Sequence, residues 1–236
     1  SGSWIQLNNY TGYYYGTVSG DITVTPGDII EFKLQKYRDY YYTSYGDVDD
    51  FTVNHGLSAN TYNKVTLNNS ELFTNIITDT SMVFNNTNIK SHNTGIEINN
   101  GDLSMTNCVL EGGDGNAISS NGNSTNIILN NTTINDFDDY GIYCKSVSSL
   151  ISLNNCSISG GSLDGIFSDG SNMEISLYNS EISDFNRYGI YSNNNVIINS
   201  QYSFINDNDY GIYASSSATE INLSSSRISH NNIYGI

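Results

Sequence analysis

The sequence predicts an all-β protein, a right-handed parallel β-helix with three short strands in each coil and 22–24 residues per coil. Two observations predict it. The chain repeats at that period from Gly95 to Ile236, and each repeat holds three short apolar segments separated by Asn, Ser and Gly. Such a period is typical of a stacked array in which each unit buries its apolar face against its neighbours.

The first apolar segment of each repeat is a small residue followed by isoleucine. The spacings between successive isoleucines are 22, 24, 24, 24, 22 and 24 residues. The pairs are Gly95-Ile96, Ala117-Ile118, Gly141-Ile142, Gly165-Ile166, Gly189-Ile190, Gly211-Ile212 and Gly235-Ile236.

The other two segments also have the composition and length of strands. The second is an aliphatic pair with one residue between its members, as in Ile127/Leu129 and Ile151/Leu153. Both segments are short and alternating, as half-buried strands are, and neither is long enough for a helix. The third segment centres on one residue per repeat: Leu110, Ile134, Ile158, Ile182, Phe204 and Ile228.

An asparagine stands between the second and third segments, and Gln201 and Ser225 replace it in the last two repeats. Stacked amides can hydrogen-bond along the coil axis, and Asn tolerates the left-handed backbone of a sharp turn. We therefore expect a buried structural ladder rather than a binding site, formed by Asn69, Asn86, Asn107, Asn131, Asn155 and Asn179.

The two ends of the chain differ from the repeats. Residues 1–64 lack the period and hold 10 of the 19 tyrosines, so we expect a β-rich cap or small leading domain there, covering the first strand edges. Its tyrosines serve either packing or glycan contact. Residues 65–236 are expected to form the β-helix. The chain ends two residues into a new repeat, which suggests an open end in a fragment of a longer surface protein.

The strings YGIY, LNNCSI and LNNTTI over residues 65–236 resemble the parallel β-helix repeat proteins of the pectate-lyase-like superfamily. The richness in Asn, Ser, Ile and Tyr is similar to adhesin-like surface proteins of methanogenic archaea and to some bacterial cell-surface β-helices. The resemblance implies the fold. It leaves the function open, because the superfamily includes lyases, hydrolases, epimerases, phage tailspikes and adhesins.

Charge and cysteine content narrow the classes of partner. The net charge of −16 disfavours nucleic acid and anionic membrane surfaces, and no apolar stretch approaches the length of a membrane span. Cys108 and Cys156 fill a position that Thr132 and Ser180 fill in other repeats, and Cys144 lies on another strand. We therefore expect structural thiols rather than metal ligands or nucleophiles.

No enzyme signature emerges, so the sequence favours a non-catalytic protein without excluding an enzyme. The Asn-Thr-Asp, Gly-His-Gly and Arg-Ile-Lys motifs of β-helical pectin hydrolases are absent, and Lys145, Arg187 and Arg227 occupy different positions within the repeat. One acidic feature recurs in the loop before each small-Ile pair. It predicts either a solvated edge or a calcium site at Asp136, Asp138, Asp139, Asp164, Asp184, Asp207 and Asp209.

An aromatic residue follows the inward isoleucine in four consecutive repeats and should point outward. The rings could stack against sugars, or they could simply stabilise the sheet by contacting each other. They belong to Tyr143, Phe167, Tyr191 and Tyr213.

Together these features favour an extracellular, non-catalytic β-helix, a stalk or adhesin segment at the cell surface whose partner is a polysaccharide or cell-surface glycan. It would require no cofactor, with Ca²⁺ as the candidate ion. One alternative is a calcium-dependent polysaccharide lyase or related carbohydrate-active enzyme. Another is a phage tailspike or fibre segment, which would be a trimer.

Overall fold

The computed structural model describes residues 30–31, 51–53, 64–68, 71–73, 76–78 and 81–236, and it places side chains for 76–78 and 81–236. These residues form strands, turns and loops, with no helix among them. Most of the predicted cap and the predicted ladder residue Asn69 lie outside the described residues.

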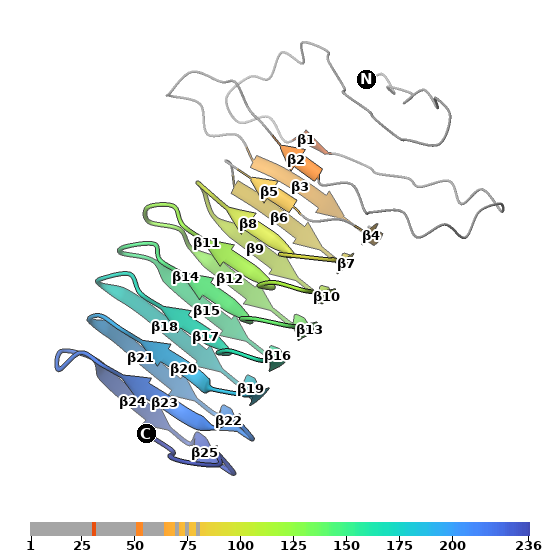
Figure 1. Ribbon diagram of the computed structural model, residues 1–236. Helices are drawn as coiled ribbons and strands as arrows, with labels where there is room; N and C mark the ends of the chain where they lie inside the picture. Colours follow the sequence, from red (N-terminus) through yellow and green to blue (C-terminus); the bar gives the residue numbers. More distant parts are fainter. Residues whose placement is uncertain (1–29, 32–50, 54–63, 69–70, 74–75, 79–80) are drawn as a thin grey trace.

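The strands form three parallel sheets, and each coil visits the sheets in the order A, C, B (Figure 1). Sheet A consists of β1 (Ile30–Glu31), β3 (Lys64–Asn68), β6 (Ser81–Asn85), β9 (Leu103–Thr106), β12 (Ile127–Asn130), β15 (Leu150–Asn154), β18 (Met173–Tyr178), β21 (Val196–Gln201) and β24 (Glu220–Ser224). Sheet C consists of β4 (Glu71–Phe73), β7 (Asn88–Lys90), β10 (Val109–Gly113), β13 (Thr133–Phe137), β16 (Ser157–Gly161), β19 (Glu181–Phe185), β22 (Phe204–Asn206) and β25 (Arg227–Ser229). Sheet B consists of β2 (Phe51–Val53), β5 (Ile76–Thr78), β8 (Ile96–Ile98), β11 (Ile118–Ser120), β14 (Ile142–Cys144), β17 (Ile166–Ser168), β20 (Tyr188–Ser192) and β23 (Tyr210–Ala214).

This arrangement confirms the predicted parallel β-helix with three strands per coil. Equivalent residues of successive coils pair directly, so that Ile142 lies between Ile118 and Ile166. From β5 to β23 the inward isoleucines and leucines are buried and form one core that runs along the axis, and Ile221 and Ile228 of the last coil are partly buried against it. Two short strands of the predicted cap also take part: β1 pairs with β3, and β2 pairs with β5.

The corner between sheets A and C is made by two residues. The first has a left-handed backbone, with φ between 46° and 54° at the five described ladder asparagines. The second has a small polar side chain that turns inward and donates a hydrogen bond to the carbonyl two residues earlier, as Thr132 does to Asn130 at 2.9 Å. Cys108 and Cys156 occupy this second position and donate through sulfur in the same way. The three cysteines are free and buried, and burial raises the pKa of each thiol. The geometry therefore favours a structural role for these thiols.

Two assignments near residue 200 were wrong by one residue. The left-handed corner residue after Asn179 is Tyr202 (φ 54°) and not Gln201. The inward residue of β22 is Ile205, which pairs with Ile182, whereas Phe204 points outward and is 47% exposed. The reason is that this coil is one residue shorter at each of two corners: Met173 pairs with Val196, 23 residues on, and Tyr188 pairs with Tyr210, 22 residues on. Spacing measured between isoleucines of sheet B combines the two deletions and cannot locate either.

Glycine and phenylalanine alternate from coil to coil at the last residue of four successive strands of sheet C, β10, β13, β16 and β19. Gly113 pairs with Phe137, and Gly161 pairs with Phe185. A Cβ atom on Gly113 would lie 2.9 Å from the Phe137 ring, and one on Gly161 would lie 2.8 Å from the Phe185 ring. Each phenylalanine therefore fills the space that the glycine of the preceding coil leaves open.

Candidate functional site

The predicted asparagine ladder exists, but it lies on the surface. Asn107 donates an amide hydrogen bond to Asn86 at 3.1 Å, and Asn131 donates one to Asn107 at 3.1 Å. Asn179 donates to Asn155 at 2.6 Å. No such bond joins Asn131 to Asn155, so the ladder among the described residues has two sections. All five of these asparagines are exposed, which corrects the expectation of a buried stack. The left-handed backbone turns each side chain outward at the corner.

The four aromatic residues of sheet B stack on one another along the axis. The Tyr143 and Phe167 ring centroids are 5.0 Å apart with planes 11° from parallel. The Phe167–Tyr191 and Tyr191–Tyr213 pairs are 5.2 and 5.4 Å apart, with planes 1° and 12° from parallel. Neighbouring rings therefore cover each other's faces, and the stack presents mainly ring edges and hydroxyl groups outward. This geometry is that of a ladder that supports the sheet. Sugar binding by these four residues stays a prediction.

A second row of tyrosines packs beside this stack, one residue before each glycine. Tyr188 contacts Tyr191, Tyr210 and Tyr213, with centroid distances between 4.8 and 5.2 Å. Tyr140 contacts Tyr143 and Phe167 in the same way. The two rows together form a continuous aromatic surface over this end of sheet B.

Asp164 takes the place of a tyrosine in this second row and is fully buried. Its Oδ1 accepts a hydrogen bond from the Tyr188 backbone N–H at 3.3 Å and lies 3.6 Å from Arg187 Nε, while Oδ2 has no hydrogen-bond partner. Burial raises the pKa of Asp164 to about 6, and the Arg187 guanidinium opposes that shift. Burial and the charge of Asp164 together raise the pKa of Tyr140. A buried carboxyl group without access to solvent is poorly placed to act on a polymer.

The other six acidic residues of the predicted calcium site spread over several positions at the corner between sheets C and B. Asp136, Asp184 and Asp207 occupy its left-handed position, with φ near 60°. Each of these accepts a hydrogen bond from the side chain just before it, as Asp184 does from Ser183 at 3.0 Å. Gly160, also at positive φ, separates Asp136 from Asp184 in this column. Asp209 accepts a bond from Asn232 at 2.9 Å, and Asp138 and Asp139 lie in neighbouring positions of the loop.

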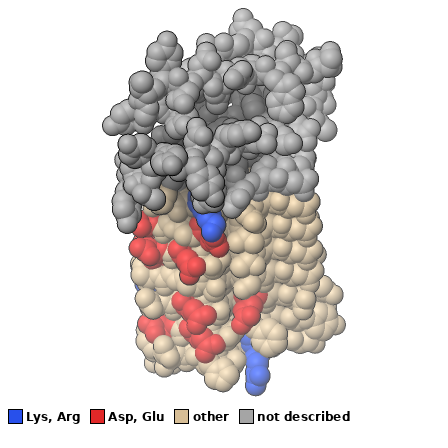
Figure 2. Space-filling view, turned by 90° about the vertical axis from the view of Figure 1, so that its right-hand side faces the viewer, with Lys and Arg blue, Asp and Glu red and all other residues tan. Residues whose placement is uncertain are grey.

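No three His, Cys, Asp or Glu side chains converge into a metal-binding cluster within the described part of the chain. Figure 2 shows acidic side chains gathered on one side of that part, with a basic side chain near each end of the group. A calcium site therefore stays a prediction, for which the described carboxylates show no preformed cluster.

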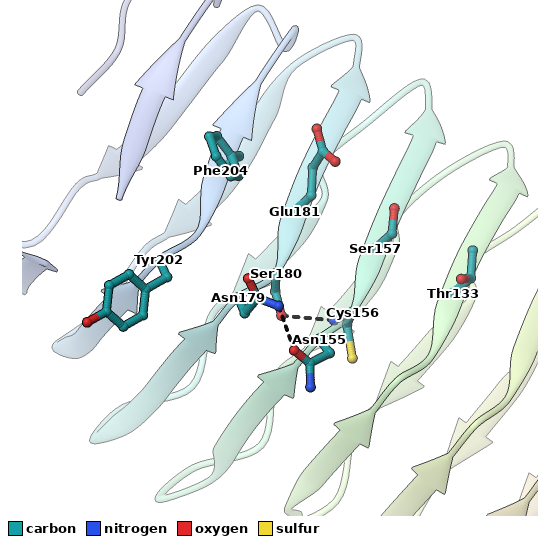
Figure 3. A pocket seen from close by; sticks show the side chains of 9 residues that line it. All are labelled: Thr133, Asn155, Cys156, Ser157, Asn179, Ser180, Glu181, Tyr202 and Phe204. Atoms are coloured by element: carbon teal, nitrogen blue, oxygen red, sulfur yellow. Dashed lines mark hydrogen bonds between the residues drawn. The ribbon is translucent and has the colours of Figure 1, made fainter. Parts of the chain in front are cut away.

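A groove of about 320 Å³ crosses the coils at the other corner, beside the second section of the asparagine ladder (Figure 3). Its floor is formed by the corner residues Asn155 and Asn179 and by the outward residues of sheet C. Tyr202 and Phe204 stand at one end, and Thr133 stands at the other. The lining residues are Thr133, Asn155, Cys156, Ser157, Asn179, Ser180, Glu181, Tyr202 and Phe204.

Register explains why a hollow forms at this place. Thr133, Ser157, Glu181 and Phe204 are paired in succession and form one outward column of sheet C. The two small residues leave space, whereas Glu181 and Phe204 rise beside it. Sequence reasoning missed this site because it assigned Phe204 to the interior. The signal was the aliphatic Ile205 next to it, which completes the inward column once the one-residue deletion is recognised.

Comparison of the chain with models of protein families, with characterised proteins and with solved structures gives no match. In the described residues there is no helix of the length and apolarity that crossing a membrane requires.

Proposed function

We propose that this chain is a non-catalytic extracellular β-helix, a stalk or adhesin segment at a cell surface that binds carbohydrate. The proposal combines the observed fold with the resemblance of the repeat sequences to adhesin-like β-helix proteins. One observation carries it: two columns of side chains on the outside of the coils, the asparagine ladder and the aromatic stack of sheet B, bond or stack with their counterparts one coil away, along the axis. Asn107 bonds Asn86 and Asn131, and Phe167 stacks on Tyr143 and Tyr191.

This kind of surface suits an extended rod. Because each coil contacts only its neighbours, axial ladders add resistance to bending and fraying without any contribution to chemistry. An acidic surface also keeps such rods apart from one another. The Asn and Tyr ladders are therefore explained by mechanical support, which is what a stalk or adhesin requires.

The enzyme alternatives need an arrangement that the described residues do not present. A calcium-dependent lyase would need carboxylates gathered around an ion and a cationic base within reach of it. The one described carboxyl group with a strongly raised pKa, Asp164, is fully buried beside Arg187. No observation singles out the tailspike alternative.

The test asks whether polysaccharides retard the migration of the protein in a gel and whether the protein degrades them. The protein is run through gels containing single polysaccharides, both neutral glucans and pectate, and it is then incubated with the same polymers in millimolar calcium. We expect slower migration in at least one polysaccharide gel and no new reducing ends or unsaturated products. Release of either product, abolished by a substitution in this chain, would overturn the proposal in favour of an enzyme.

A further inference from the structure

We propose that the groove beside Asn155 and Asn179 is a saccharide-binding site that takes a short neutral oligosaccharide lying along the coil axis. The inference rests on the proposed carbohydrate-binding function and assigns it a place. It moves the expected contact from the aromatic stack of sheet B to the corner between sheets A and C.

The groove offers hydrogen-bonding groups that the protein itself leaves unused. Asn179 donates to the Asn155 carbonyl oxygen, so the Asn155 amide N–H₂ and the Asn179 carbonyl oxygen face outward without a partner (Figure 3). The Ser157 and Thr133 hydroxyls and the Glu181 carboxylate also have no partner among the described residues. The floor therefore presents both donors and acceptors, which matches sugar hydroxyl groups because each of these both donates and accepts.

Aromatic rings close one end of the groove. Tyr202 and Phe204 are 48% and 47% exposed. Tyr178 packs edge-on against Tyr202, with centroids 5.8 Å apart and planes at 87°, and so holds that ring in place. These rings are not stacked face to face with a neighbour as those of sheet B are. They can therefore offer apolar area to the C–H face of a sugar at low entropic cost.

The shape of the groove selects the orientation of the ligand. Thr133 and Phe204 are three coils apart in one column, which corresponds to about 14 Å at the usual strand spacing. The volume of about 320 Å³ is at the lower end of the range for small-molecule sites. A short linear saccharide along the axis satisfies both dimensions.

Charge and backbone pairing disfavour other ligands. No Lys or Arg lines the groove, and Glu181 would repel a uronic acid or a phosphate. Arg227, the next residue of the column, lies beyond Phe204. A peptide that adds as a strand needs an unpaired sheet edge. The strands at the groove, β16 and β19, are each paired on both sides.

The left-handed backbone at Tyr202 allows a variant that removes the ring without straining the fold. Asparagine occupies the equivalent position, with the same φ, in the five preceding coils. Tyr202→Asn should therefore leave the melting temperature unchanged or raise it, because Asn is better suited than Tyr to positive φ. Phe204→Ala removes the second ring and leaves the inward Ile205 in place. Tyr213→Ser, at an exposed ring of sheet B, is the matched control.

The experiment is calorimetric titration with cello-, malto-, manno- and chitotetraose, and with tetragalacturonate as the acidic counterpart. We expect at least one neutral tetrasaccharide to bind, Tyr202→Asn and Phe204→Ala each to weaken it at least tenfold, and Tyr213→Ser to leave it unchanged. Unaltered binding in both groove variants would overturn the site while leaving carbohydrate binding by the protein intact. Absence of binding to all four neutral sugars, or preference for tetragalacturonate, would also overturn it. Neither result resembles the polymer cleavage that would overturn the non-catalytic function.

Discussion

Phe167 and Tyr191, on adjacent coils, lie with their ring planes 1° from parallel and their centroids 5.2 Å apart. The same relationship continues to Tyr143 on one side and Tyr213 on the other. Rings stacked in this way stabilise each other. A ring face that contacts another ring is also not available to a ligand.

Replacing Tyr191 and Tyr213 together with serine should therefore lower stability rather than abolish binding. The double variant loses the Phe167–Tyr191 and Tyr191–Tyr213 stacks, and we expect a loss of roughly 0.2–1 kcal/mol for each pair. Urea unfolding measures the loss, and Tyr178→Ser, which removes one exposed ring with a single ring contact, is the control. Collapse of glycan affinity at unchanged stability would instead show that the stack is a sugar platform.

The corner asparagines should act on stability mainly through the backbone. Asn155 is exposed and has φ of 52°, so Asn155→Ala places an unsuitable residue in the left-handed region at a cost of about 1 kcal/mol. Asn155→Gly loses the same bond from Asn179 but tolerates the backbone, and it should cost less. Urea midpoints compare the two, with the exposed Asn123→Ala as the control. Equal losses for Ala and Gly would assign the effect to the side-chain hydrogen bond.

Asp164 should make the protein less stable as the pH rises from about 4 to about 6. Its folded-state pKa is raised from 3.8 to about 6, so in that window the folded protein binds more protons than the unfolded chain. Stability is then highest below pH 4, falls through the window and is level above it. Asp164→Asn should remove the slope and stabilise the protein at pH 7 by up to about 3 kcal/mol. Asp138→Asn, at an exposed position, should leave the slope unchanged, and a slope that persists in Asp164→Asn would show that another group is responsible.

Calcium bound at the predicted acidic site should raise the melting temperature, whereas a solvated acidic edge should leave it unchanged. The carboxylates of Asp136, Asp184 and Asp207 each accept a bond from a neighbouring side chain, and no described cluster gathers three ligands. Thermal unfolding with and without millimolar calcium tests this directly, because a ligand bound to the folded state raises the melting temperature by mass action. A rise that disappears in the double variant Asp138→Asn, Asp184→Asn would establish the calcium site.

Much of the fold could be predicted because the residues that face the interior recur at nearly regular intervals in the sequence. The inward isoleucines that follow a small residue, and the five described corner asparagines, fall where the sequence places them. A Cβ on Gly95 would lie 2.6 Å from the carbonyl oxygen of Ala117, and one on Gly141 would lie 2.6 Å from that of Gly165, so these coils approach the next too closely for a side chain there.

The surface was less predictable, because it depends on register between coils rather than on composition within one. Gln201 and Phe204 were assigned wrongly, since a 23-residue step and a 22-residue step are indistinguishable without knowing which corner is shorter. The groove follows from that register alone. Likewise, the burial of Asp164 is a consequence of its position between tyrosine-bearing coils, which no local pattern around it reveals.

The alternation of Phe137 and Phe185 with Gly113 and Gly161 means that two coils, not one, are the smallest interchangeable part of this region. Removing one 24-residue coil would bring glycine against glycine or phenylalanine against phenylalanine, which leaves a void in the first case and a clash in the second. Removing or duplicating 48 residues would keep the alternation intact. Recombination between repeats of such a gene would therefore be expected to change the length of the protein in even numbers of coils.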